Sequence, residues 1–220
     1  MTMINVNGTE LFYTKSGQGE PMLLLHGNGE DHHIFDRLSQ KLQKEFTVYA
    51  IDSRNHGKSA QTEQYDYERM ADDIIDFIDV LKLEKVNIVG FSDGAILAII
   101  MGIQKLSCLN KLALLGANTS PDQLKPEIFD HIVEKYEETK NPLFKLMMEQ
   151  PSIPLQELRK IEVPTLIIAA DDDLCELEIF EQMHQLIEAS DLKIMENQDH
   201  GSYIIDNDIL AEPLLDFFSA

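Results

Sequence analysis

The stretch at residues 85–100, KVNIVGFSDGAILAII, places a serine between two glycines in Gly90-Phe91-Ser92-Asp93-Gly94. The apolar run before the serine is typical of a buried strand, and the run after it is typical of a helix. A serine on such a sharp turn presents its hydroxyl above the edge of a sheet. We therefore interpret Ser92 as a candidate nucleophile; the alternative is an ordinary turn residue.

The rest of the chain repeats the alternation of strand and helix. Two helical patterns are at 66–82 and 178–189, and near-continuous apolar runs are at 21–27, 46–52, 85–91, 111–117, 164–170 and 192–196. Runs of this kind are expected of strands that are covered on both faces. The pattern predicts an α/β fold with a mostly parallel central sheet and helices on both faces. The segments 3–8 and 10–17 predict an antiparallel hairpin at one edge.

We expect a single domain over residues 1–220, with one insertion. Residues 119–163 separate two predicted strands and are too long for a plain connection. Their periodicity predicts helices near 126–140 and 142–149, which together form a small helical cap. Apolar side chains of the second helix are candidates for substrate binding, and the alternative is that they only pack against the body: Phe144, Met147 and Met148.

The excess of acidic residues excludes some classes of binding partner. The chain has 18 basic and 39 acidic residues, a formal net charge of −21. Such a surface repels phosphate backbones and anionic lipids, so we expect no nucleic-acid or membrane partner. The two cysteines, Cys108 and Cys175, suggest no metal site and fit a reducing compartment. With no targeting segment recognisable, we expect a cytoplasmic protein; the oligomeric state is left open.

A serine hydroxyl needs a base, and the base needs an orienting acid. His200 follows the last predicted strand, so its loop opens at the carboxyl edge of the sheet, where Ser92 also lies. The loop after the strand at 164–170 carries three aspartates, 171–173, at the same edge. One of them can reach His200; the alternative for this acidic run is a solvated turn or a weak cation site.

Five blocks follow one another along the chain: LLLHGNGED (23–31), AIDSRNHGKS (50–59), GFSDG (90–94), VPTLIIAADDD (163–173) and DHG (199–201). In this order they resemble the α/β-hydrolase superfamily from end to end. The resemblance implies Ser92 as nucleophile, His200 as general base and Asp173 as the orienting acid, with Asp172 as the fallback. It also implies an oxyanion hole made by the backbone N–H groups of Asn28 and Asp93.

Three positions depart from the family pattern. Asn55 stands where the family usually has glycine, and asparagine tolerates left-handed backbone. Ala170 replaces the glycine that usually precedes the acid. Asp93 places a carboxyl next to the nucleophile, and we expect its side chain to point outward or to contact the substrate. For Arg54, in the second block, we expect a structural role.

The resemblance implies acyl transfer to water through an acyl-enzyme, without a metal or an organic cofactor. We expect a carboxylesterase that cleaves small or medium uncharged esters. The alternatives are the same triad acting on lactones, thioesters or C–C bonds or transferring acyl groups to another acceptor, and a non-catalytic receptor for small ligands. A serine nucleophile argues against haloalkane dehalogenase and epoxide hydrolase activity, because both rely on an aspartate.

Overall fold

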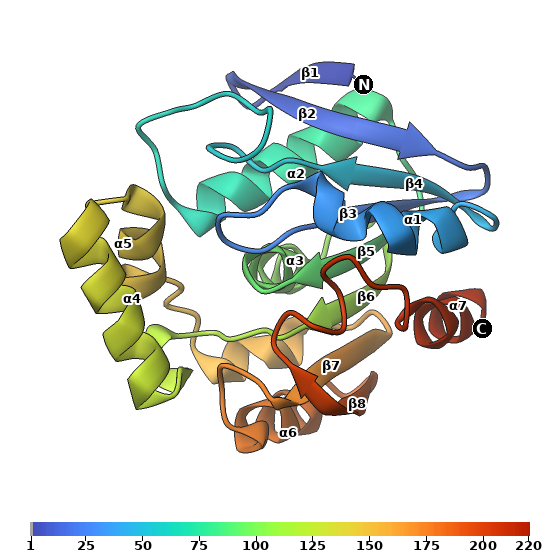
Figure 1. Ribbon diagram of the computed structural model, residues 1–220. Coiled ribbons are helices and arrows are strands. Elements are labelled where there is room, and N and C mark those ends of the chain that lie inside the picture. Colours follow the sequence, from blue (N-terminus) through green and yellow to red (C-terminus); the bar gives the residue numbers. More distant parts are fainter. Residues whose placement is uncertain (1) are drawn as a thin grey trace.

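The computed structural model describes residues 2–220, which are built around an eight-stranded sheet (Figure 1). The strands are β1 (Thr2–Val6), β2 (Thr9–Ser16), β3 (Glu20–Leu25), β4 (Phe46–Ile51), β5 (Val86–Phe91), β6 (Leu109–Leu115), β7 (Thr165–Asp172) and β8 (Ser190–Asp199). Their order across the sheet is β1-β2-β4-β3-β5-β6-β7-β8. Every pair from β4 to β8 is parallel, whereas β2 pairs antiparallel with both β1 and β4. The predicted parallel sheet with an edge hairpin is confirmed.

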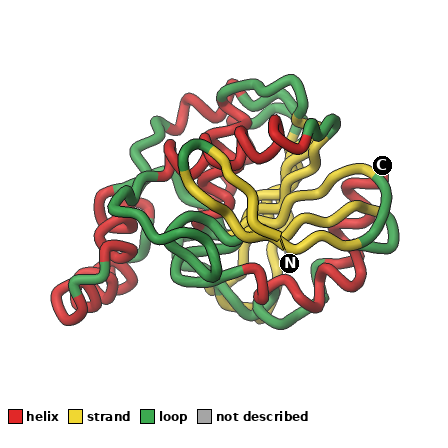
Figure 2. The backbone as a smooth tube through the Cα atoms, turned by 90° about the horizontal axis from the view of Figure 1, so that it is seen from above, coloured by secondary structure: helices red, strands yellow, loops and turns green. Residues whose placement is uncertain are grey.

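Helices cover both faces of the sheet, as Figure 2 shows from above. They are α1 (Asp36–Leu42), α2 (Tyr67–Leu81), α3 (Asp93–Ile103), α4 (Pro126–Thr139), α5 (Pro142–Glu149), α6 (Leu177–Leu186) and α7 (Ala211–Ser219). Helices α2, α3 and α6 share one hydrophobic core with the sheet, and α1 and α7 share the core on the opposite face. The order of the strands is what places Ser92, between β5 and α3, near the middle of the sheet.

The sequences of α2 and α3 explain their positions. Helix α2 has an apolar stripe toward the core and aspartates elsewhere, and its first turn is capped by Asp66, whose side chain accepts the Arg69 N–H. Helix α3 is apolar on all sides and is buried along most of its length. A helix of that kind is stable only when it is packed on several sides, here by the sheet, by α2 and by the short 3₁₀ helix Leu155–Lys160.

The inserted segment contains α4 and α5, which project from the body at the left of Figure 1. Both helices begin with a proline, a residue favoured in the first turn because it lacks the N–H that would be unpaired there. The two helices lie where the sequence predicts them.

Two elements differ from the sequence prediction. Helix α1 was not predicted, because its seven residues, DRLSQKL, are too few to show a clear period. Strand β8 is longer than the predicted 192–196, because it continues to Asp199, which pairs with Asp172 of β7 after a shift in register. An edge strand tolerates such a polar end, since one of its sides faces solvent.

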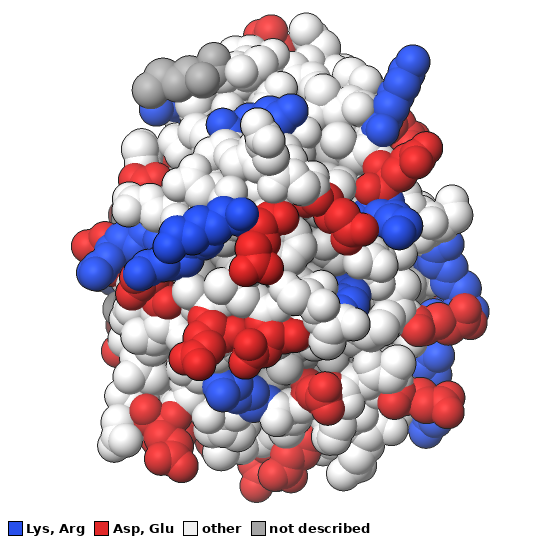
Figure 3. Space-filling model, turned by 90° about the vertical axis from the view of Figure 1, so that its right-hand side faces the viewer, with Lys and Arg blue, Asp and Glu red and all other residues white. Residues whose placement is uncertain are grey.

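On the face in Figure 3, acidic side chains lie among lysines and arginines instead of forming one patch. The excess of acidic residues therefore acts mainly through the negative electrostatic potential around the molecule, which attracts cations and repels anions at long range. None of the helices within residues 2–220 has the length and apolar character needed to cross a bilayer.

A buried ion pair fixes the segment between β4 and α2. The Arg54 guanidinium donates to both carboxyl oxygens of Asp73, at 2.6 Å and 2.5 Å, and both side chains are buried. Asn7 donates to the same carboxyl from the edge hairpin. The structure thus places Arg54 in the interior, where it joins this segment to α2. In the same turn Asn55 has the left-handed φ of 66° that the sequence analysis allows.

Replacing Asp73 by asparagine should destabilise the fold by about 3–5 kcal/mol, because the Arg54 charge would stay buried without a counter-charge. Urea unfolding followed by circular dichroism measures the difference. The matched control is Lys145→Gln, which removes one partner of an exposed pair with Glu149 and should change stability little. Equal midpoints for the two variants would contradict this account of the ion pair.

Candidate active site

Ser92 occupies a strained turn between β5 and α3. Its backbone has φ 52° and ψ −114°, a conformation that a residue with a side chain rarely adopts. The flanking glycines make the turn feasible. A Cβ on Gly90 would lie 2.3 Å from the Gly94 carbonyl oxygen, and a Cβ on Gly94 would lie 2.1 Å from the Leu25 carbonyl oxygen. The glycine-serine-glycine spacing is therefore required by the close approach of β3, β5 and α3.

His200 and Asp173 follow two neighbouring parallel strands, β8 and β7, and meet at their carboxyl ends. His200 Nδ1 lies 2.6 Å from Asp173 Oδ1, and the aspartate is buried. The same carboxyl accepts the N–H groups of Ala170 and Leu174, at 2.9 Å and 2.8 Å. Three donors thus hold Asp173 in place, so that it orients the imidazole.

The neighbouring aspartates have other partners. Asp172 is exposed and pairs with Lys125 at 3.2 Å, and Asp171 accepts the N–H groups of Asn197 and Gln198. Of the three aspartates, Asp173 is the one that contacts His200. Its choice over Asp172 as the orienting acid stays a prediction.

Ser92 and His200 line one cavity of about 210 Å³, here called the His200 cavity. Its lining also includes Asn28, Glu30, Phe144 and Met147. Within the described residues no hydrogen bond joins the Ser92 hydroxyl to His200. Such contacts are often long before substrate binds and tighten in the complex. The serine and the histidine–aspartate pair therefore face the same space.

A second cavity, of about 20 Å³, lies on another side of Ser92 and is here called the Cys175 cavity. Tyr67, Asp93, Ile96, Leu124 and Cys175 are among its lining residues, and Met147 lines both cavities. Burial raises the pKa of the Cys175 thiol to about 12, so this side chain is a neutral wall at neutral pH.

The backbone N–H groups of Asn28 and Asp93 are free to bind an anionic oxygen. Neither donates a hydrogen bond to another residue in the described part of the chain. Asp93 is the first residue of α3, whose N-terminus favours negative charge. The loop that carries Asn28 is tied to the start of α3, because the Gly94 N–H donates to the His26 carbonyl at 3.0 Å.

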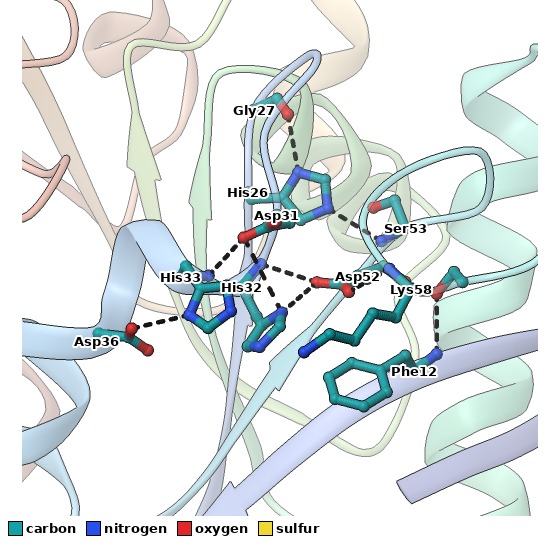
Figure 4. Close-up of polar contacts among 11 residues, drawn as sticks. Phe12, His26, Gly27, Asp31, His32, His33, Asp36, Asp52, Ser53 and Lys58 are labelled. Carbon is teal, nitrogen blue, oxygen red and sulfur yellow. Dashed lines mark hydrogen bonds and ion pairs between the residues drawn. The ribbon is translucent and has the colours of Figure 1, made fainter. Parts of the chain in front are cut away.

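His26 supports this loop as a neutral side chain (Figure 4). Its Nε2 accepts the Ser53 N–H at 3.0 Å, so Nδ1 carries the proton and donates to the Gly27 carbonyl at 2.8 Å. Burial, followed by the nearby His56, lowers the pKa of His26 to about 4. The imidazole therefore joins the Asn28 loop to the segment after β4 without introducing a charge.

Three side chains beside this loop, Asp31, His32 and His33, bring candidate metal-ligand atoms within 4.8 Å of one another. Figure 4 shows that these groups already have protein partners. His32 Nδ1 is bound to Asp52, His33 Nδ1 to Asp36, and Asp31 accepts the His33 N–H. We assign the cluster to the scaffold of the loop.

The side chain of Asp93 does not lie where the sequence analysis expects it. It is buried and neither points outward nor lies free for substrate, because its oxygens accept Tyr67 Oη at 2.7 Å and Asn28 Nδ2 at 2.9 Å. Burial raises the pKa of this carboxyl, and the two hydrogen bonds partly offset that effect. Asp93 therefore links α2, α3 and the Asn28 loop.

Two of the three predicted substrate-binding residues, Phe144 and Met147, line the His200 cavity. Met148 is not among the lining residues of either cavity beside Ser92, so its part in substrate binding stays a prediction. One residue along a helix turns the side chain by about 100°, away from the face that Met147 presents. Glu30 is a lining residue that the sequence analysis missed, because a single charge in a loop is typical of solvated surface.

Comparisons with known proteins show the family of the chain. Residues 20–145 match the family described as the alpha/beta hydrolase fold. The human serine hydrolase BPHL is 33% identical over 151 residues, a match that covers 64% of this chain and 52% of that protein, so the chain spans about half of this relative's length. The AB hydrolase superfamily protein YisY of Bacillus subtilis is 28% identical over 239 aligned positions, with 88% and 89% covered.

The solved structure of an esterase from Exiguobacterium antarcticum, EaEST, has a TM-score of 0.86 to this chain. The two sequences are 24% identical, and the match covers 100% of this chain and 99% of the other. This likeness shows a common fold.

The site geometry predicts a large difference between two adjacent aspartates. Asp173→Asn should lower kcat for p-nitrophenyl acetate by roughly 10³–10⁴, because the amide would stabilise the wrong imidazole tautomer. Asp172→Asn, its matched control, should stay within a few-fold of the wild type. Steady-state kinetics of both variants measure the effect, and a larger loss in Asp172→Asn would show that the acid had been assigned to the wrong residue.

Proposed function

The chain belongs to the α/β-hydrolase family, and we propose that it is a serine hydrolase, specifically a carboxylesterase for small or medium uncharged esters. One observation carries the proposal: Ser92, on its strained turn, shares a cavity with a histidine that is held by a buried aspartate. Two free backbone N–H groups, those of Asn28 and Asp93, flank the serine.

In the proposed reaction Ser92 Oγ attacks the ester carbonyl while His200 accepts the hydroxyl proton. Because Nδ1 of His200 is bound to Asp173, Nε2 is the nitrogen that takes the proton. The Asn28 and Asp93 N–H groups bind the oxyanion of the tetrahedral intermediate. His200 then gives the proton to the leaving alcohol, and water enters to hydrolyse the acyl-enzyme by the same steps.

The two cavities suggest how an ester binds. His200 must reach the leaving alcohol, so the alcohol side belongs in the His200 cavity of about 210 Å³. The acyl side then belongs in the Cys175 cavity, whose volume of about 20 Å³ has room for little more than one water-sized group. This division favours short acyl groups, of the size of acetyl.

The first test is hydrolysis of p-nitrophenyl esters from acetyl to decanoyl by the wild type and by Ser92→Ala. We expect the highest kcat/KM for the shortest acyl chains, because longer chains exceed the Cys175 cavity. Ser92→Ala should lower kcat by at least about 10³, since it removes the nucleophile and leaves only binding and the oxyanion donors.

The serine and alanine side chains share the same Cβ, so the variant should unfold at the temperature of the wild type. If Ser92→Ala hydrolyses the esters about as fast as the wild type, Ser92 is not the nucleophile. If kcat/KM is highest for the decanoyl ester, the acyl group does not bind in the Cys175 cavity. Tight ligand binding without Ser92-dependent turnover would favour a receptor on the same fold.

A further inference from the structure

The proposed esterase mechanism leaves one carboxyl of the site without a role. Glu30 lines the His200 cavity together with Ser92 and His200. The described lining of this cavity contains no lysine or arginine, and no ion pair joins Glu30 to a basic side chain among the described residues. The remaining walls include the aromatic rings of Phe91 and Phe144.

The position of Glu30 is fixed by the loop that carries Asn28. Its Oε2 accepts the Gly27 N–H at 2.9 Å, whereas its Oε1 accepts no hydrogen bond from the described residues. A Cβ built on Gly27 would lie 2.8 Å from this Oε2 and 3.0 Å from the Ser92 Cβ. The carboxyl and the nucleophile therefore lie against the same side of Gly27, and one carboxyl oxygen is available to a ligand.

The side chain of Glu30 changes its charge near neutral pH. Burial raises the pKa of Glu30 to about 7, and the Gly27 N–H and His200 counteract part of this effect. Asp93 and Asp31 also face this carboxyl and raise its pKa further. The carboxylate form is therefore gained as the pH rises through about 7, and a cation in the cavity would favour it.

We propose that Glu30 determines specificity on the alcohol side, and that the His200 cavity prefers esters whose alcohol carries a cationic ammonium group. The proposal rests on the proposed esterase function. It adds esters with a cationic alcohol to the uncharged esters proposed above. A carboxylate compensates the cost of removing a cation from water, and aromatic rings attract cations through their faces. The net charge of −21 adds a long-range attraction.

The test uses two esters of equal shape: 2-(trimethylammonio)ethyl acetate and its neutral carbon isostere, 3,3-dimethylbutyl acetate. The measured quantity is the ratio of their kcat/KM values between pH 5.5 and 8.5. A pH effect on the chemical step that the two esters share cancels in the ratio, and the charge of the quaternary ammonium does not change with pH. We expect the ratio to favour the cation and to rise roughly tenfold as Glu30 ionises, because the carboxylate attracts the ammonium charge.

Glu30→Gln keeps an oxygen that can accept the Gly27 N–H and should abolish this rise. The matched control, Glu63→Gln, removes one exposed carboxyl that lines another cavity and should retain it. A pH-independent ratio in the wild type, a rise that survives in Glu30→Gln, or an equal loss in both variants would overturn the proposal.

Failure of the esterase function would give a different result, namely no Ser92-dependent hydrolysis of either ester. The role of Glu30 is then tested by calorimetric titration with tetramethylammonium at pH 5.5 and 8.5. Binding that is stronger at pH 8.5 in the wild type and is lost in Glu30→Gln supports the cation site. Absent binding, or equal binding in both proteins, contradicts it.

Discussion

The left-handed backbone at Ser92 is the constraint on which the rest of the site depends. A residue in that conformation is destabilised by about 1–3 kcal/mol and persists only where its surroundings fix it. Here the Ser92 N–H donates to Leu115 on β6, and the Gly94 N–H donates to His26 after β3. The strands on both sides of β5 therefore hold the turn, and the glycines let β3 and α3 approach it. Exposure of the serine hydroxyl above the sheet is a consequence of this packing.

Buried carboxylates connect the loops around that turn. Asp173 orients His200, Asp93 joins Tyr67 to Asn28, and Asp52 accepts the His32 and Lys58 N–H groups below the Asn28 loop. Each accepts several hydrogen bonds, which offset the cost of burying a carboxyl. Part of the acidic composition of this chain thus serves internal organisation. Glu30 is the exception, because one of its oxygens has no donor among the described residues and it lines the cavity that we assign to the leaving group.

The architecture could be predicted from the sequence because it depends on local patterns, whereas the catalytic roles of the proposed triad stay predictions. Apolar runs of strand length predict the sheet, and the spacing around Ser92 predicts the turn. The contact between His200 and Asp173 follows from two neighbouring strands that end at one edge. The partners of Asp93 could not be predicted, since Tyr67 and Asn28 come from distant segments. The sequence could not show which residues of α5 line the cavities beside Ser92. That depends on how α4 and α5 pack against the body, and the period of a single helix does not determine it.

The central claim is that Ser92 is a nucleophile activated by His200. The most direct measurement is covalent labelling with a fluorophosphonate, followed by mass spectrometry of the intact protein and of its peptides. The account predicts one adduct per chain, on the peptide that contains Ser92, and slow labelling of His200→Ala, which retains the serine and lacks the base. Absence of an adduct, an adduct on another residue, or equally fast labelling of His200→Ala would contradict the claim.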